Sequence, residues 1–248
     1  MAPEVLMSGF LEIEAINKRF RGLRALDDIS FAVDEGGVFG VIGANGAGKT
    51  TLFNIISGAM KPDSGLIRFA GNLVTGHTPS NLCIAGIART FQIARPFPDM
   101  TVLETIRIAV LCRVRNMRAA TARAADIAGR FGLTKKLDRL GRHLSVLERK
   151  RLELARAYAT EPRLLLLDEV AAGLRPGEVD DLVAIIRSIA DENITVLMIE
   201  HVLAAVFALA RRVVVLDQGR VIAQGAPQAV AEDARVIEAY LGAGYAAA

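Results

Sequence analysis

Residues 43–50, with the sequence G-A-N-G-A-G-K-T, constrain the fold more than any other stretch of this chain. They fit the pattern G-x-x-x-x-G-K-[ST] at every fixed position. The continuous apolar run 38–42 precedes them, as is typical of a strand that is buried on both faces of a parallel sheet. A helix is expected to begin in residues 51–56. A glycine-rich loop between a buried strand and a helix N-terminus binds phosphate, so we predict an α/β nucleotide-binding fold.

The residues of this loop are expected to have different roles. Gly43, Gly46 and Gly48 permit a tight turn whose backbone amides face phosphate oxygens. Lys49 is expected to reach the β- and γ-phosphates, and the Thr50 hydroxyl suits Mg²⁺, which prefers oxygen ligands. We therefore predict ATP and Mg²⁺ as cofactors. The other loop residues that we expect at the nucleotide are Asn45, Ala47 and Thr51.

Two carboxylates, Asp168 and Glu169, directly follow the four leucines at 164–167. A buried strand would place them at its carboxyl end, which is where ligands bind in open α/β sheets. Asp168 can hold Mg²⁺ through water opposite Thr50, and Glu169 can orient or deprotonate the attacking water. The alternative is a pair of solvated loop acids, but the phosphate loop upstream favours the catalytic interpretation.

Three further residues are weaker candidates when position alone is considered. His201 follows the expected strand 195–199 and could donate a hydrogen bond to a γ-phosphate. Gln92 lies where the sheet pattern ends and could contact the metal and report the nucleotide state. Phe20 precedes a turn and could stack on adenine. A structural histidine and a core phenylalanine remain open alternatives.

Hydrophobic periodicity divides the chain into three parts. Residues 11–16 and 29–33 alternate like strands, residues 93–159 have apolar positions at helical spacing, and strands and helices alternate again afterwards. The last part contains the expected helix 179–191 and a hairpin at 213–222, with its turn at 217–219. We predict a single domain over residues 1–248 with a mixed or parallel core sheet and an antiparallel β region. Its expected parts are a sheet core at 11–92 and 160–222, an inserted helical subdomain at 93–159, and a C-terminal helical tail at 223–248.

The composition fits an ordinary globular protein and excludes several classes. The net charge is +3, from 30 basic and 27 acidic residues, which does not identify a nucleic-acid binder. Cys83 and Cys112 have no metal-ligand spacing, so we expect two free core thiols in a reducing compartment. The start shows no secretory signal and no run approaches 18 apolar residues, so any membrane role is expected to come through a partner.

Taken together, these residues resemble the nucleotide-binding domain of ATP-binding cassette (ABC) transporters over about residues 11–241. Three stretches are most similar to the ATP-binding subunit of branched-chain amino-acid importers: G-I-A-R-T-F-Q at 86–92, I-E-H at 199–201, and V-I-E-A-Y-L-G at 236–242. The resemblance implies a P-loop ABC cassette with a Walker A loop at 43–50 and a Walker B strand at 164–168. It assigns the other roles to Glu169 (catalytic glutamate), Gln92 (Q-loop, also at the metal), His201 (switch histidine) and Phe20 (adenine stacking).

The resemblance also implies partners. Such cassettes work as homodimers or heterodimers with a second ABC ATPase subunit and sandwich ATP between one subunit's Walker A loop and the other's signature loop. They drive membrane permease subunits, serve indirectly a periplasmic substrate-binding protein, and lie in the cytoplasm on the inner face of the cell membrane. No nucleic acid is expected as a partner. The stretch 93–98 is where the family docks its permease, and we expect Phe97 to be an exposed contact there.

The signature segment departs from the family pattern Leu-Ser-x-Gly-Gln. Here it is L-S-V-L-E at residues 144–148. Ser145 can still donate a hydrogen bond to a γ-phosphate, but Leu147 would obstruct close backbone approach, and an inward Glu148 would repel the phosphate. Val170 and Arg175 also depart from the family on the expected dimer interface. We therefore hypothesise that a partner ATPase supplies a regular signature loop and that one composite site is weaker.

Two other functions remain as alternatives. A non-transport ABC ATPase acting on nucleic acid or the ribosome would use the basic residues Arg113, Arg115, Arg118 and Arg123, although a charged helix face is usually solvated. A hydrolysis-impaired regulatory cassette would explain the altered signature, although the Walker residues argue against it.

Overall fold

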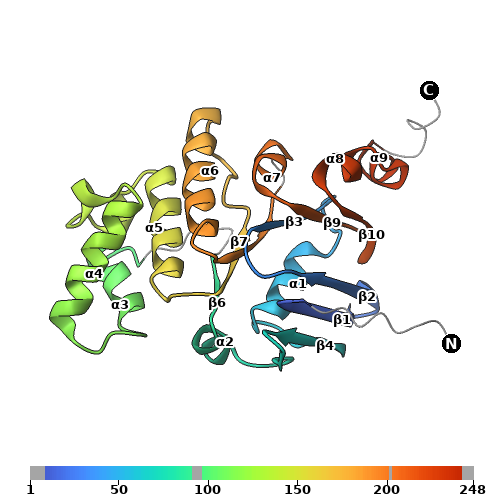
Figure 1. Cartoon of the computed structure of the whole chain (residues 1–248), viewed down its shortest axis with the longest axis horizontal. Helices are drawn as coiled ribbons and strands as arrows, with labels where there is room; N and C mark the ends of the chain where they lie inside the picture. The colour runs from blue at the N-terminus through green and yellow to red at the C-terminus, as the bar shows by residue number, and fades with distance from the viewer. Residues whose placement is uncertain (1–8, 91–96, 201–202, 242–248) are drawn as a thin grey trace.

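The computed structural model describes residues 9–90, 97–200 and 203–241 (Figure 1). One sheet is antiparallel and has the strand order β2-β1-β4-β5. Its strands are β1 Leu11–Phe20, β2 Leu23–Val33, β4 Ser64–Phe69 and β5 Asn72–Leu73. This sheet is the antiparallel region that the sequence predicts.

Strand β1 interrupts the alternation of its sequence. Leu11 and Ile13 are buried, as a period of two requires, but Ala15 is exposed with φ +50° and Ile16 is buried. The pairing register with β2 shifts between Ile13 and Ile16. A bulge at this point turns Ile16 to the core face that strict alternation would give to Ala15.

The second sheet is mixed and has the strand order β10-β9-β3-β8-β7-β6. All its neighbouring pairs are parallel except β9 with β10. Its strands are β3 Val38–Gly43, β6 Ile87–Arg89, β7 Leu164–Asp168, β8 Thr195–Ile199, β9 Arg212–Asp217 and β10 Arg220–Gly225. The predicted fold class is confirmed. Since β3, β8 and β7 are adjacent and parallel, the phosphate loop after β3 and Asp168 at the end of β7 meet at one sheet edge.

Six helices accompany the two sheets in the described residues. They are α1 Lys49–Ile56, α2 Pro79–Ala85, α6 Pro176–Ala190, α7 Leu203–Leu209, α8 Pro227–Ala231 and α9 Ala234–Leu241. Helix α2 lies in a stretch that the strand pattern does not predict, although Thr78 caps it and a proline begins it. Helix α6 begins before the predicted residue 179 for a similar reason, because Pro176 fixes a helical φ at its first position. Strand β10 continues to Gly225, so the predicted tail at 223 starts as a strand.

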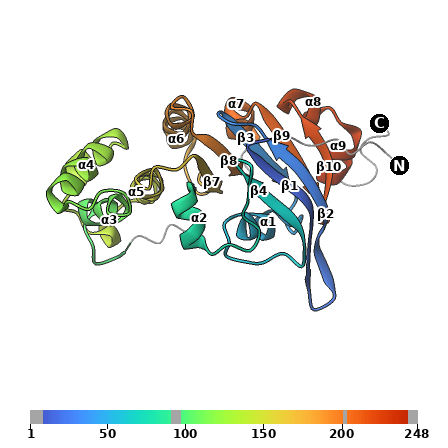
Figure 2. The ribbon, with the colours of Figure 1, turned by 60° about the horizontal axis from the view of Figure 1, so that its bottom comes forward.

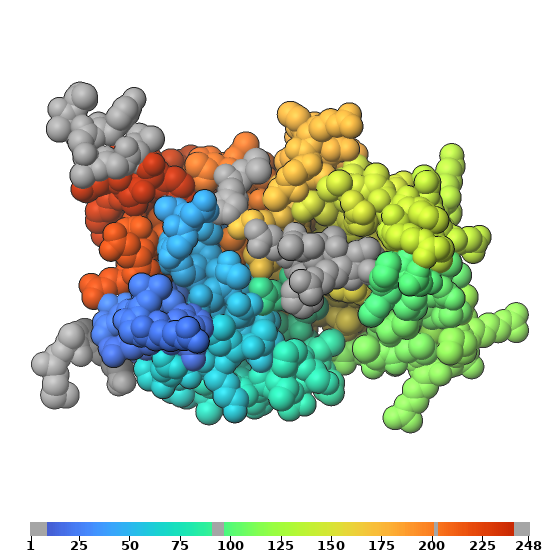
Figure 3. Space-filling view, turned by 180° about the vertical axis from the view of Figure 1, so that it is seen from behind, coloured from blue at the N-terminus to red at the C-terminus, as the bar shows by residue number. Residues whose placement is uncertain are grey.

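The helical part lies beside the sheets (Figure 2). Seen from behind, it forms one end of the molecule, and the sheets lie toward the other end (Figure 3). It consists of α3 Val102–Val110, α4 Met117–Arg130, the 3₁₀ turns Thr134–Lys136 and Gly141–His143, and α5 Val146–Tyr158. All of these elements fall within the predicted range 93–159.

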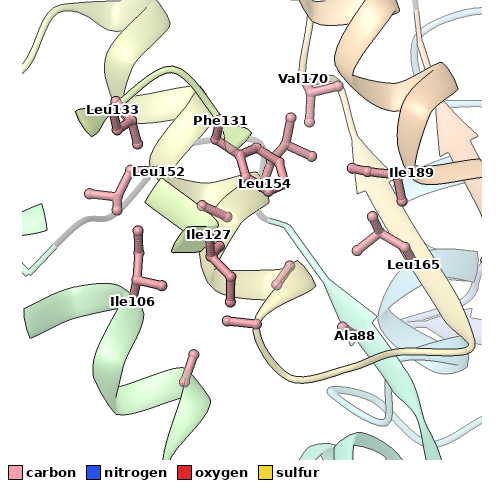
Figure 4. Packing of buried hydrophobic residues seen from close by; sticks show 14 of the residues in the cluster. Ala88, Ile106, Ile127, Phe131, Leu133, Leu152, Leu154, Leu165, Val170 and Ile189 are labelled. Atoms are coloured by element: carbon pink, nitrogen blue, oxygen red, sulfur yellow. The ribbon is translucent and has the colours of Figure 1, made fainter. Parts of the chain in front are cut away.

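One hydrophobic core joins the helical part to the mixed sheet. Ile106, Phe131 and Leu154 of the helical part belong to the same buried cluster as Leu165 of β7 and Ile189 of α6 (Figure 4). A second cluster on the other face packs α1 against β1 and β2. The mixed sheet is thus covered on both faces, which explains its nearly unbroken apolar strands.

The structure tests two expectations from composition, the burial of the cysteines and the lack of a membrane-spanning run. Both cysteines are free, but Cys112 is exposed and Cys83 is half-buried, so the expected core positions were wrong. Cys112 lies in the turn that follows residue 110, at the end of the first helix of the helical part, and Cys83 lies in helix α2. Among the described residues, no helix combines the length and apolarity needed to cross a membrane.

Candidate functional site

A cavity of about 850 Å³ opens at the carboxyl end of β3. It brings the predicted residue Phe20, the loop residues Asn45 to Thr51, and Glu169 together from three separate parts of the sequence. The remaining lining residues, none of which the sequence predicts at the site, are Leu23, Arg24, Ala25 and Gln218.

Two glycines of the loop are required by close backbone packing. Gly43 has φ +153°, and a Cβ there would lie 2.2 Å from the Leu216 carbonyl oxygen. Gly48 has φ +102°, and its Cβ would lie 2.6 Å from the Ala25 carbonyl oxygen. Any other residue would push the loop away from β9 or β2. The tight loop geometry is therefore fixed by its neighbours as well as by its own sequence.

The turn between β9 and β10 is hydrogen-bonded to the phosphate loop. Gln218 and Gly219 both have positive φ, as in a two-residue type I′ hairpin turn. The Gly219 amide donates a hydrogen bond to the Ala47 carbonyl (3.1 Å), and the Gly219 carbonyl accepts one from the Asp27 amide (2.7 Å). The hairpin turn thus ties the phosphate loop to β2.

Lys49 is buried, and its ammonium group folds back onto the loop. Its Nζ donates hydrogen bonds to the carbonyl oxygens of Gly43 (2.7 Å) and Ala44 (2.8 Å). Burial lowers the pKa of Lys49, while the charges of Glu169 and Asp168 oppose that shift. The ammonium is therefore held by backbone carbonyls, which a bound phosphate can replace as its partners.

The first turn of α1 is open to an anion. Its N-cap is Gly48, and no side chain of the described residues caps its amides. The first turn contains no acidic residue either. Because no side chain of the described residues caps these amides, they and the positive end of the helix dipole can bind an anion in the cavity. Thr50, the predicted metal ligand, is exposed in this turn.

Asp168 is 2% exposed, and its two carboxylate oxygens differ. Oδ2 accepts a hydrogen bond from Arg89 Nη2 at 2.7 Å. Oδ1 is buried and has no hydrogen-bond partner among the described residues. An orphaned carboxylate oxygen is costly unless a ligand or water satisfies it, so the donor set fits a hard cation such as Mg²⁺.

No group of three or more His, Cys, Asp or Glu side chains in the described ranges could hold a metal without help. A cation at Asp168 would therefore need oxygens from Thr50 and from a bound nucleotide, which is how Mg²⁺ usually binds phosphates.

Glu169 has a strained backbone that several partners hold. Its φ is +49°, which is unusual for a residue other than glycine. Its amide donates to the Ile199 carbonyl (2.9 Å), and its carbonyl accepts from the Ala172 amide and from Lys150 Nζ, both at 3.2 Å. The turn after β7 is thus fixed by β8 on one side and by helix α5 on the other.

Lys150 and Glu200 are functional candidates that sequence reasoning missed. Lys150 is 8% exposed, and Glu200 is 2% exposed with a carboxylate oxygen 2.7 Å from the Ala171 amide. Burial lowers the pKa of Lys150, and the charges of Glu200 and Glu169 oppose this shift. One sequence signal could have identified Lys150. It lies four residues before Leu154, so both side chains fall on the same, buried face of the helix.

The sequence and fold comparisons point to one family. The family described as "ABC transporter" matches residues 26–172, and the family described as "Branched-chain amino acid ATP-binding cassette transporter" matches residues 220–246. The chain belongs to the ABC transporter family. As a member it is an ATP-binding cassette and an ATPase, as its sequence predicts.

Individual relatives cover almost the whole chain. The chain is 38% identical to the high-affinity branched-chain amino acid transport ATP-binding protein BraF of Pseudomonas aeruginosa, over 94% of this chain and 97% of that protein. It is 35% identical to LivG of Escherichia coli K12, with the same coverage. The ADP conformation of the cassette MJ1267 is similar in structure, with a TM-score of 0.86 and 33% identity over 95% of this chain and 99% of that one.

In this cassette the signature segment begins helix α5. The Ser145 hydroxyl accepts a hydrogen bond from the Glu148 amide (3.2 Å), and Glu148 Oε2 accepts one from the Ser145 amide (2.8 Å). Lys136 pairs with Glu148 Oε1 at 3.0 Å. These contacts, led by the Ser145 amide, lower the pKa of Glu148. The carboxylate is therefore held at the helix start. Ser145 is exposed and does not line the cavity, so its role at a nucleotide stays a prediction.

Other predicted residues have different outcomes. Gln92 and His201 lie outside the described residues, and their roles stay predictions. Phe97 is 45% exposed with the Arg156 guanidinium 5.8 Å from its ring centre, as expected for a surface residue. Val170 is buried in the cluster shared with the helical part, so its side chain serves packing.

Two arginines of the basic run have partners within the chain. Arg113 donates hydrogen bonds to the carbonyls of Cys83 (3.0 Å) and Thr160 (2.9 Å). Arg123 pairs with Glu161 at 2.7 Å. These contacts stabilise the join between the helical part and the sheet, so half of the run has a structural explanation.

Proposed function

We propose that this chain is the Mg²⁺-dependent ATP-hydrolysing subunit of an importer for branched-chain or related amino acids. One observation carries the hydrolytic part of the proposal. Lys49, Thr50 and Glu169 line one cavity, and Oδ1 of Asp168, which has no hydrogen-bond partner within the described part of the chain, lies directly before Glu169 at the end of β7. This arrangement supplies a phosphate clamp, a metal-binding oxygen pair and a base.

Each residue of the site has its own role in this proposal. The open first turn of α1 and Lys49 bind and orient the phosphates, and Thr50 and Asp168 would hold Mg²⁺. When bound, the ion neutralises charge on the phosphate oxygens. In this proposal Glu169 accepts a proton from the attacking water, and the partners that hold its strained backbone support its orientation. Gln92 and His201 complete the site in this proposal.

The substrate and partners rest on the relatives. The names of BraF and LivG describe branched-chain amino acid transport, and the C-terminal match at 220–246 supports the same class. Permease subunits on the inner face of the membrane, a second ATPase subunit and a periplasmic binding protein follow from that class. Exposed Phe97 supports a docking surface beside the stretch 93–96.

A direct test reconstitutes the transporter. The genes beside this one are expected to encode two permeases, a second cassette and a binding protein, and these would be purified with this chain into proteoliposomes. ATP hydrolysis should depend on Mg²⁺ and rise when the binding protein carries leucine, isoleucine or valine. If only another class of amino acid stimulates ATP hydrolysis, the proposed substrate is wrong. Stimulation by DNA or RNA would favour the nucleic-acid alternative.

The altered signature favours one second candidate, a cassette with impaired turnover. Leu147 is half-buried in the first turn of α5, where the family has glycine. Comparing hydrolysis by the purified chain alone and with its second cassette separates the cases. We expect much faster hydrolysis by the mixed pair. Equal hydrolysis at both sites of a homodimer would contradict the proposal that a partner must supply a regular signature loop.

A further inference from the structure

We infer that Arg89 is a positioning residue for the cation site. Its guanidinium holds one oxygen of Asp168, and this contact turns the other oxygen toward a divalent cation. The inference rests on the proposed Mg²⁺ site at Asp168.

The contacts of Arg89 form a buried bridge. It is the last residue of β6, next to β7, and its side chain is 8% exposed. Nη2 donates to Asp168 Oδ2 at 2.7 Å. Nη1 donates to Asn54 Oδ1 (2.7 Å) and to Ser57 Oγ (2.8 Å). Arg89 therefore connects the metal-binding carboxylate to the C-terminal end of α1.

This bridge fixes the carboxylate relative to the phosphate-binding helix. Helix α1 carries Lys49 and Thr50 at its first turn and Asn54 near its end. The Asp168 carboxylate cannot rotate without breaking a buried, charge-assisted hydrogen bond. Since Oδ2 is occupied, Oδ1 is the oxygen left without a partner among the described residues. A planar guanidinium suits this task, because it can bind two elements in fixed directions.

Two physical effects of Arg89 on a cation have opposite signs. Orienting a ligand strengthens metal binding, and loss of such an outer partner typically costs about 10- to 100-fold in metal affinity. A neighbouring positive charge repels the cation and would weaken binding. The buried, three-point anchoring favours orientation as the larger effect. The sign of the change in a neutral variant therefore decides between them.

The test measures metal binding rather than turnover. The full chain would be titrated with Mn²⁺ in the presence of a non-hydrolysable ATP analogue, and free Mn²⁺ would be followed by electron paramagnetic resonance. We expect Arg89→Met to weaken Mn²⁺ binding by about 10-fold or more. Its affinity for the analogue in EDTA should stay within about twofold of the parent's, because the loop amides and Lys49 are untouched.

A matched control is Arg163→Met, which removes an exposed arginine paired with Glu35 at the surface and should leave Mn²⁺ affinity unchanged. Asn54→Ala keeps the ion pair with Asp168 but removes one anchor of Arg89, so it should weaken Mn²⁺ binding by less than Arg89→Met. This variant decides the question if Arg89→Met does not fold. Combining Arg89→Met with Asp168→Asn should weaken binding no further than Asp168→Asn does alone.

Unchanged or tighter Mn²⁺ binding by a folded Arg89→Met variant would overturn the inference, and so would an Asn54→Ala variant with unchanged affinity where Arg89→Met does not fold. The result is separate from the proposed function. If the parent chain does not hydrolyse ATP but Arg89→Met still weakens Mn²⁺ binding, the positioning role of Arg89 holds and the proposed function is wrong. If the parent chain hydrolyses ATP and Arg89→Met binds Mn²⁺ as tightly as the parent does, the positioning role is wrong and the proposed function holds.

Discussion

Two helices of this cassette begin in opposite ways, although both N-termini belong to segments that the family uses at phosphate. Helix α1 begins after Gly48, and no side chain of the described residues caps its first turn. Helix α5 begins after Ser145, and its own Glu148 closes a capping box over the free amides. The first helix start is open to an external anion, whereas the second already carries an internal one.

The difference indicates which function each segment keeps. In the phosphate loop, close contacts with β2 and β9 exclude any side chain at Gly43 and Gly48. In the signature segment, the capping serine and the acid three residues later close the helix start, while Leu147 replaces the family's glycine and Glu148 its glutamine. The contrast supports the proposal that the phosphate loop binds this chain's own nucleotide, whereas the segment that would face a partner's nucleotide is altered. If a second cassette with a regular signature loop is the partner, as we propose, the two composite sites would differ.

The largest effect should come from the nucleotide cavity beside the phosphate loop. Glu169→Gln should retain ATP binding within about twofold and reduce turnover by about 10²- to 10⁴-fold, because the amide cannot accept a proton from water. Phosphate release and binding of a fluorescent ATP analogue measure the two quantities. Glu232→Gln, which changes an exposed acid outside the cavity, is the control. Hydrolysis by Glu169→Gln at the original rate would show that another residue is the base.

A tenfold gain is expected from the altered half-site. Leu147→Gly restores the small residue of the family pattern, so a facing phosphate could approach the backbone of α5 more closely. Hydrolysis by the purified chain alone should then rise by about 10-fold, a change of about 1.4 kcal/mol in the barrier. Val146→Gly is the control, since the family tolerates any residue there. If both variants hydrolyse ATP like the parent, Leu147 is not what limits the homodimer.

The sequence predicts the phosphate loop, the two carboxylates and the fold class because each depends on a local pattern. The pattern at 43–50 requires a particular strand and helix beside it, and four leucines before Asp168 require a buried strand. Alternation also predicts most strands, but not the bulge at Ala15, which follows from pairing with both β2 and β4. Local sequence thus determines elements better than it determines how they are joined.

The supporting contacts of the site could not be predicted in the same way. The ion pair of Arg89 with Asp168 joins residues 79 positions apart, and Lys150 reaches Glu169 from a different layer of the fold. Periodicity places Lys150 on a buried helix face but does not name its partner. Such pairings depend on the three-dimensional packing of β6, β7 and α5, which no single stretch encodes.

A smaller catalytic effect should come from the contact between the helix of the altered signature and the proposed base. Lys150 lies on α5, the helix of the altered signature, and holds the backbone of Glu169. Lys150→Met should lower kcat about 5-fold while leaving the affinity for ATP unchanged, because a lost hydrogen bond of about 1 kcal/mol loosens the direction of the base. Lys150→Arg should recover part of the rate. A variant that changes KM and not kcat would contradict a role in positioning Glu169.

The smallest effect should concern stability at the capped helix start. Glu148→Gln should lower the free energy of unfolding by about 0.5–1 kcal/mol at neutral pH, as the loss of a helix cap does. Because the Ser145 amide lowers the pKa of Glu148 below its ordinary value of 4.5, its contribution is present above that value and is lost as the pH falls through the folded-state pKa. Urea unfolding of the parent and the variant at decreasing pH should therefore give curves that converge in acid. A difference that persists below the pKa of Glu148 would mean that the side chain stabilises α5 through packing, and the contrast with the uncapped start of α1 would then not be one of charge.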